Sequence, residues 1–203
     1  MSKVIVVDGF CEYIDEVVAS SNAAGYGKWA PNKGEVGSSI YEGMNYTGHH
    51  SLMLRSIVEH TGSVVIPNSM FFRITNRGFE KAYIHSDREM GNHTCVAYLS
   101  EHEEEYGTAF YRHKPTGLTE MPSFAEMREM GIMDQLKEDM VSRDPEVWEQ
   151  TDFVEGKYNR AVIFEAPLFH SRIPVEGIGS SDEDGRLVWV SHFYKLHGDG
   201  TFH

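Results

Sequence analysis

The chain has 203 residues, of which 40% are hydrophobic and 12% aromatic, and its formal net charge at pH 7 is −13. This length and apolar content fit a single folded domain over residues 1–203 and exclude a disordered chain. Lysine and arginine carry the binding of nucleic acids and anionic membranes, so the acidic balance argues against both partners. Any anionic ligand must therefore be met by a few local arginines.

Cysteine content and the amino-terminal residues indicate the compartment. Cys11 and Cys95 are too few and too far apart in sequence for a disulfide framework. The apolar run from Val4 to Val7 is shorter than the apolar core of a signal peptide. Nothing later reaches the roughly 20 apolar residues of a membrane span. We expect a cytoplasmic protein without membrane contact, and its oligomeric state stays open.

Two helices and a loop are expected in the first third of the chain, after a short strand over Val4–Val7. Apolar residues recur at helical spacing over Glu12–Ala24 and again over His50–His60. Between them, Tyr26–Asn45 is rich in Gly, Asn, Pro and Ser, which is typical of a loop.

Short strands are expected in the middle of the chain. Four runs of β-branched, aromatic or alternating residues cover Ser63–Thr75, Lys81–His85, Thr94–Leu99 and Thr108–Arg112. Since they follow one another with turns between them, we interpret them as consecutive strands of one sheet.

In the last part of the chain the residue pattern changes from strand-like to helix-like and then back to strand-like. Residues 116–156 are interpreted as a helical insertion, in which the Met-rich stretch Met121–Met140 is either a packing face or a substrate lid. Strands return over Ala161–Phe164 and Arg186–Tyr194, separated by an acidic turn over Glu176–Gly185. Helices followed by many short strands predict an α+β domain built on an antiparallel sandwich or barrel.

Three residues are candidate metal ligands among the eleven histidines and the acidic residues. His85 and Asp87 stand two positions apart at the end of an expected strand, so their side chains point to the same face. A second His-x-Asp, over residues 197–199, follows the last expected strand and is interpreted as a chance match. His170 follows an apolar strand and a proline turn, which suits a third ligand. Two histidines and one carboxylate leave positions open on an ion, as non-haem Fe(II) enzymes require.

One arginine stands out near the end of the chain. Arg186 begins an otherwise apolar strand, where a charged side chain needs a partner. A guanidinium at the mouth of a small barrel matches a carboxylate through two parallel hydrogen bonds, although an ordinary ion pair is the alternative.

The order of these motifs resembles the Fe(II)/2-oxoglutarate-dependent dioxygenases, and the prolyl-hydroxylase-like branch with its small uncharacterised bacterial and phage members is nearest. The resemblance runs from about Pro67 to Tyr194. The motifs that carry it are His85-Ser86-Asp87, Tyr98-Leu99, Gly107-Thr108-Ala109-Phe110, the segment Arg160 to Val175 around His170, and Gly185-Arg186.

This resemblance implies a double-stranded β-helix core (jelly roll, cupin-like) with N-terminal supporting helices and a helical insertion. It implies Fe(II) held by His85, Asp87 and His170, and 2-oxoglutarate bound to the iron with its far carboxylate on Arg186. The implied reaction uses O2, converts 2-oxoglutarate to succinate and CO2, and hydroxylates an unidentified small-molecule or peptidyl substrate. Halogenating relatives lack the carboxylate that Asp87 supplies here, so hydroxylation is the default outcome.

Two departures from the family pattern concern the cosubstrate. Many relatives carry a serine two residues after the arginine, but this position is Val188, so Tyr98 is the candidate to supply a hydroxyl. The gap from His170 to Arg186 is longer than usual, which leaves Arg172 as a rival for the carboxylate.

Two other functions stay open. One is a catalytically silent jelly-roll binding protein that tolerates loss of the metal. The other is a cupin-like or hydrolytic enzyme using Zn, Mn or Ni, although the chain has neither His-x-His nor His-Glu-x-x-His. Specificity is expected in the loops over residues 26–45 and 112–158, whose composition does not identify the substrate.

Overall fold

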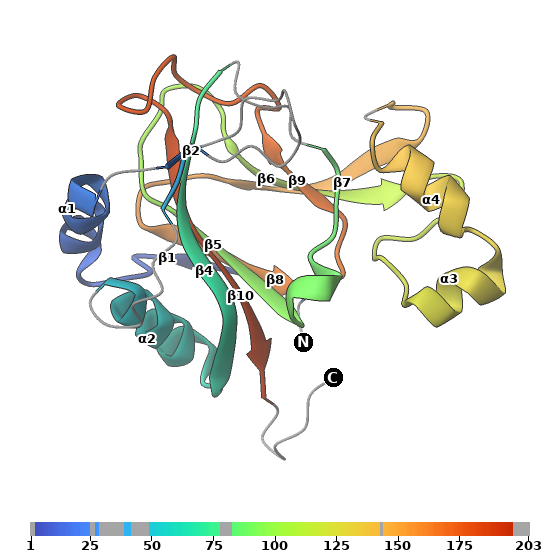
Figure 1. Cartoon of the computed structure of the whole chain (residues 1–203), viewed down its shortest axis with the longest axis horizontal. Helices are drawn as coiled ribbons and strands as arrows, with labels where there is room; N and C mark the ends of the chain where they lie inside the picture. The colour runs from blue at the N-terminus through green and yellow to red at the C-terminus, as the bar shows by residue number, and fades with distance from the viewer. Residues whose placement is uncertain are drawn as a thin grey trace.

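The computed structural model describes residues 3–24, 27–28, 39–41, 49–77, 83–142 and 144–196. These residues form two antiparallel sheets with α-helices at their sides (Figure 1). In spatial order, the large sheet contains β1 (Val4–Asp8), β8 (Arg160–Glu165), β5 (His93–Tyr98), β10 (Arg186–Lys195), β4 (Val65–Thr75), β3 (Ser39–Tyr41) and β2 (Gly27–Lys28). The small sheet contains β7 (Trp148–Glu155), β6 (Gly107–His113) and β9 (His170–Ile173).

The outer face of the large sheet is covered by α1 (Ile14–Ala24) and α2 (His49–Thr61), which lie together at one side in Figure 1. Every second residue of β10 points toward these two helices. Trp189 is packed in one apolar cluster with Val17 of α1 and Ile57 of α2. Burial of the apolar face of each segment against the sheet explains why both segments are helical there.

The inner face of the large sheet meets the small sheet. Val188 of β10 and Val96 of β5 pack with Phe110 of β6 and Val154 of β7 in a second apolar cluster. Because side chains alternate along a strand, the residues on this face are those at 186, 188, 190 and 192 of β10. The space between the two sheets is therefore lined by both apolar and polar side chains.

Two short helices, α3 (Phe124–Met130) and α4 (Met133–Asp139), lie beyond the small sheet (Figure 1). Ser123 and Glu126 form a capping box at the start of α3, which fixes the beginning of that helix. Met127 is buried in a third apolar cluster with Trp148 and Phe169. This agrees with the packing-face interpretation of the Met-rich stretch.

The insertion over residues 116–156 is not helical throughout, so that prediction is wrong at its end. Strand β7 occupies its last part and pairs with β6, with Phe153 opposite Ala109. In this strand only Trp148 and Val154 are buried, and the polar residues between them hide the alternation that marks a strand. Strand β9 was not expected either.

The prediction of four consecutive strands in one sheet is also wrong. Strands β4 and β5 belong to the large sheet but are separated by β10, and β6 belongs to the small sheet. Among the described residues, His85 forms an isolated bridge rather than a strand, and residues 81–82 lie outside them. Short strands β2 and β3 interrupt the predicted loop over 26–45, whose other residues fall outside the described ranges.

The remaining predicted elements are confirmed with small shifts of their ends. The described helices include none that is both long and apolar enough to cross a membrane. Cys11 and Cys95 are both buried free thiols.

Candidate metal centre and arginine pocket

Backbone pairing brings the two candidate histidines together. The amide of His85 donates to the carbonyl of His170 at 3.0 Å, and the amide of His170 donates to the carbonyl of His85 at 2.9 Å. The amide of Asp87 donates to the carbonyl of Ala166 at 2.9 Å. The segment with His85 and Asp87 is thus held in register against the chain that enters β9.

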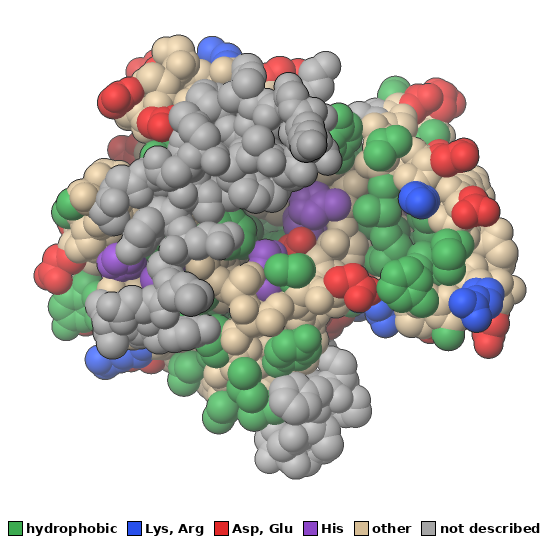
Figure 2. Space-filling model, viewed as in Figure 1, with side chains coloured by type: hydrophobic (Ala, Val, Ile, Leu, Met, Phe, Trp, Pro, Cys, Tyr) green, Lys and Arg blue, Asp and Glu red, His purple; other side chains and the backbone are tan. Residues whose placement is uncertain are grey.

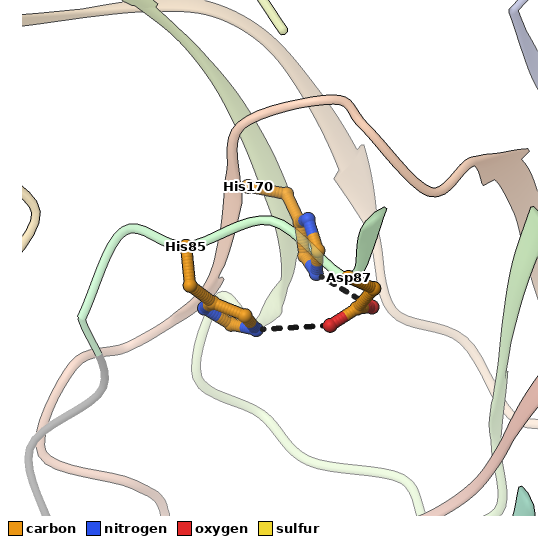
Figure 3. A group of neighbouring side chains, drawn as sticks. All are labelled: His85, Asp87 and His170. Carbon is orange, nitrogen blue, oxygen red and sulfur yellow. Dashed lines mark ion pairs between the residues drawn. The ribbon is translucent and has the colours of Figure 1, made fainter. Parts of the chain in front are cut away.

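All three candidate metal ligands converge (Figure 3). One ligand atom of each of His85, Asp87 and His170 lies within 4.8 Å of the others. His170 Nε2 is 3.3 Å from Asp87 Oδ2, and His85 Nε2 is 3.7 Å from Asp87 Oδ1. Asp87 and His170 are largely buried, whereas the His85 side chain is 47% exposed, so the cluster opens on that side. Histidine and acidic side chains reach the surface side by side near the middle of the face in Figure 2.

The hydrogen bonds of the two imidazoles fit a metal ion. His85 Nδ1 lies 2.9 Å from the carbonyl of Tyr83, and His170 Nδ1 lies 2.9 Å from the carbonyl of Leu168. A carbonyl only accepts, so each Nδ1 carries a proton, and in the neutral ring each Nε2 offers a lone pair on the side of Asp87. Two such lone pairs and a carboxylate that converge can hold a cation, and this arrangement is typical of metal-binding histidines.

Burial and neighbouring charges shift the pKa values of all three candidate ligands. Burial raises the pKa of Asp87, but the charge and hydrogen bonds of His170 and His192 lower it more, and the net pKa lies far below its usual range. Partial burial, followed by the charge of His170, lowers the pKa of His85 to about 4, so that imidazole is neutral at pH 7. Burial lowers the pKa of His170, but the charge and hydrogen bond of Asp87 outweigh it and raise that pKa overall.

Three further side chains fix Asp87, and sequence reasoning missed them. Thr94 Oγ1 donates to Asp87 Oδ2 at 2.9 Å, and His192 Nε2 lies 3.4 Å from the same oxygen. His192 Nδ1 lies 2.6 Å from Ser69 Oγ. Thr94, His192 and Ser69 stand opposite one another on β5, β10 and β4. His192 stands six positions after Arg186 on β10, and this even spacing puts both residues on one face of the strand.

Arg186 and Tyr98 lie together in the buried interior. Arg186 is 4% exposed, and its Cζ is 5.5 Å from the centroid of the Tyr98 ring. Arg186 Nε has no hydrogen-bond partner among the residues that the structure describes. Burial lowers the pKa of Arg186 to about 10, so it stays charged at pH 7. The Tyr98 hydroxyl is 2.8 Å from Thr108 Oγ1.

Arg172 occupies a different position. It follows His170 by two residues on β9 and stands opposite Thr108, so it faces the same interior. Its Nη2 donates to the carbonyl of Val175 at 3.0 Å. Burial lowers its pKa to about 10, against the opposing charge of Glu176. The structure thus brings the candidate triad together, pairs Arg186 with Tyr98, and attaches Arg172 to the chain after β9. The second His-x-Asp, at 197–199, lies outside the described residues.

A model of a protein family described as a family of unknown function (DUF6445) matches residues 74–193. The chain belongs to the DUF6445 family. The matched part of this DUF6445 protein includes the candidate triad, Arg186 and Tyr98. No curated protein matches the chain.

Solved structures of similar fold are known. The non-heme alpha ketoglutarate dependent epimerase SnoN from nogalamycin biosynthesis is 13% identical with a TM-score of 0.61, over 94% of this chain and 78% of SnoN. The carbocyclase SnoK from the same biosynthesis is 12% identical with a TM-score of 0.57, over 98% of this chain and 83% of SnoK. HygX from Streptomyces hygroscopicus, with nickel and 2-oxoglutarate bound, is 10% identical with a TM-score of 0.57, over 95% of this chain and 82% of HygX.

Because these three structures are only 10–13% identical to the chain in sequence, their similarity establishes the fold alone. This DUF6445 protein therefore has the fold of non-haem 2-oxoglutarate-dependent enzymes, in agreement with the superfamily that the sequence motifs resemble. Its placement in the prolyl-hydroxylase-like branch stays a prediction.

Proposed function

We propose that this DUF6445 protein is an Fe(II)- and 2-oxoglutarate-dependent oxygenase whose two sheets form a double-stranded β-helix. The observation that carries the proposal is the convergence of two imidazole Nε2 atoms and one carboxylate, from His85, His170 and Asp87. These three residues hold the iron. Bound iron and 2-oxoglutarate supply the oxidising chemistry with O2, which yields succinate and CO2.

Arg186 binds the far carboxylate of 2-oxoglutarate. Its buried guanidinium has an Nε without a hydrogen-bond partner among the described residues, and a buried charge of this kind needs an anion. The Tyr98 hydroxyl, held by Thr108, lies beside Arg186 and supplies the hydroxyl that Val188 lacks. Arg172 is the less suitable residue, because its guanidinium already donates to the carbonyl of Val175.

Hydroxylation of a C–H bond in a small-molecule or peptidyl substrate is the proposed outcome. The substrate reaches the iron from the exposed side of His85, the side on which the cluster is open. SnoN and SnoK are named an epimerase and a carbocyclase, so other oxidative outcomes are known on this fold. We place the reaction in the cytoplasm and expect no nucleic-acid substrate, given the net charge of −13.

The test is an anaerobic titration of the metal-free protein with Fe(II) and 2-oxoglutarate, followed by the visible charge-transfer band of the chelate. We expect a band in the wild type and none in His170→Ala. The band should be unchanged in His60→Ala, because His60 lies on α2 and its ring contacts the Phe10 carbonyl. The proposal would be contradicted if the wild-type protein binds no iron, or if it binds iron without showing the band. A band without succinate release for any substrate would favour the silent binding protein, and tight binding of Zn or Mn without a band would favour a different metal enzyme.

A further inference from the structure

Three arginines face the space between the sheets, and the proposed function uses only Arg186. Arg73 of β4 stands opposite Val188 of β10, two residues from Arg186, so Arg73 and Arg186 lie on the same face of the large sheet. On the other side of Val188 stands Tyr98 of β5. Arg172 reaches the same space from the small sheet.

The register of β4 on β10 sets the level of Arg73 between the sheets. Arg73 pairs with Val188, which stands between Arg186 and His192 on β10. The ring of His192 contacts the candidate metal ligand Asp87. The register therefore places Arg73 at a level between Arg186 and the metal centre, and burial with the charges of Arg172 and Arg186 lowers its pKa to about 9.

Arg73 adds a second positive group beside Arg186 on the inner face of the large sheet. In the proposed function, 2-oxoglutarate has one carboxylate at the iron and the other at Arg186. Arg172 is attached to the carbonyl of Val175 and lies near the charge of Glu176. Arg73 is half-buried on the inner face, where a planar guanidinium holds an oxyanion with two parallel hydrogen bonds.

We propose that Arg73 binds an anionic group of the substrate, a carboxylate or a phosphate, next to the iron site. This inference rests on the proposed function and names the substrate class for it. In a chain with a net charge of −13, a local group of arginines inside the fold selects an anion that the rest of the surface repels. Binding there presents the remainder of the substrate to the metal centre.

The experiment measures the binding of a simple oxyanion to the loaded protein. Nickel(II) and saturating 2-oxoglutarate are added first, so that Arg186 is occupied, and sulfate is then titrated by calorimetry. We expect one sulfate per chain, with affinity at least about tenfold weaker in Arg73→Gln, since one bidentate charged contact is lost. The control is Arg77→Gln, an exposed arginine of the same region that pairs with Glu104, and it keeps the wild-type affinity.

Parallel measurements separate this proposal from the proposed function. Arg73→Gln keeps its affinity for 2-oxoglutarate, whereas Arg186→Gln loses it. If Arg73→Gln does not fold, Arg73→Lys keeps the charge, loses the two-point contact, and binds sulfate more weakly than the wild type. An acetate titration tells the two substrate types apart, because a site for phosphate prefers sulfate and a site for a carboxylate prefers acetate.

Three results would overturn the assignment of Arg73. The first is wild-type protein that binds neither sulfate nor acetate once 2-oxoglutarate is present. The second is sulfate affinity that is the same in Arg73→Gln and the wild type. The third is loss of 2-oxoglutarate binding in Arg73→Gln, which would make Arg73 a cosubstrate residue. Failure of the wild type to bind 2-oxoglutarate at all contradicts the proposed function instead.

Discussion

His192 Nε2 lies 3.4 Å from Oδ2 of Asp87, while the other nitrogen of the same ring lies 2.6 Å from the hydroxyl of Ser69. A contact on each ring nitrogen fixes the orientation of this imidazole. Thr94 Oγ1 donates to the same Asp87 oxygen, so Oδ2 is engaged by the large sheet and Oδ1 faces His85. His192 is thus a positioning residue for the candidate metal ligand.

Removal of His192 should weaken metal binding without unfolding the protein. We expect His192→Ala to bind Fe(II) or Co(II) about 10- to 100-fold more weakly, because partners of a ligand set its orientation. His192→Gln should restore part of the affinity, since its amide can still donate to Asp87. Metal titration with Co(II) absorbance measures both, and the melting temperature of the metal-free protein controls for folding. Equal metal affinity in His192→Ala and the wild type would show that Asp87 needs no such support.

Substitution of the two rival arginines should identify the cosubstrate residue. Arg186→Gln should lose about 100-fold in 2-oxoglutarate affinity, as expected for a buried charge pair, and keep its Fe(II) affinity. Arg172→Gln should change 2-oxoglutarate affinity by less than about threefold, because this side chain donates to the Val175 carbonyl. Calorimetric titration of 2-oxoglutarate into the nickel-loaded variants measures both effects, and the reverse ranking would assign the carboxylate to Arg172.

Tyr98→Phe provides a finer test of the same pocket. It removes the hydroxyl that contacts Thr108 Oγ1 and keeps the ring beside Arg186. We expect 2-oxoglutarate affinity to fall by at least about tenfold, the value of one hydrogen bond to a charged carboxylate. An unchanged affinity, measured in the same titration, would limit Tyr98 to a packing role.

His50 should make stability depend on pH. Burial, followed by the charge of His49, lowers its pKa from 6.5 to about 4, and Trp189 Nε1 donates to His50 Nδ1 at 3.0 Å. The unfolded chain therefore binds a proton near pH 6.5 that the folded chain takes up only near pH 4. The contribution of His50 is complete above pH 6.5 and is lost as the pH falls toward 4, by about 2 kcal/mol between pH 7 and pH 5.

The measurement is chemical unfolding of the metal-free protein at pH 7 and pH 5. His50→Asn keeps an acceptor for Trp189 and removes the titrating group, so its loss of stability over this range should be smaller than that of the wild type by about 2 kcal/mol. The same pH dependence in both proteins would mean that His50 is not responsible.

Gly107 should tolerate no side chain. A Cβ at this position would lie 2.1 Å from the carbonyl oxygen of Val154 in β7. We expect Gly107→Ala to lose at least about 2 kcal/mol of unfolding free energy, because β6 and β7 must separate. At Gly117 an added Cβ would have no atom within 4 Å, and the only penalty is the left-handed φ of +72°. Gly117→Ala should therefore lose only about 1 kcal/mol of unfolding free energy. Thermal unfolding ranks the two, and an equal cost would remove the steric reason for this glycine.

Most local elements and the residues of the candidate metal centre could be predicted from the order of the amino acids alone. Strands such as β5 and β10 were predicted because their residues alternate or are β-branched, and this property lies within the strand. His85, Asp87, His170 and Arg186 were predicted from motif order, and the structure brings the first three together.

The neighbours of each strand, and the side chains that meet across strands, depend on long-range contacts and emerge only in the folded chain. Strand β7 exists because it pairs with β6, although its own residues are mostly polar. The positions of His192 and Arg73 follow from β10 lying between β5 and β4, an order that long-range hydrogen bonds set. Alternation fixes the face of each residue within a strand, but it carries no information about the strand alongside, so these two residues could not be placed from the sequence.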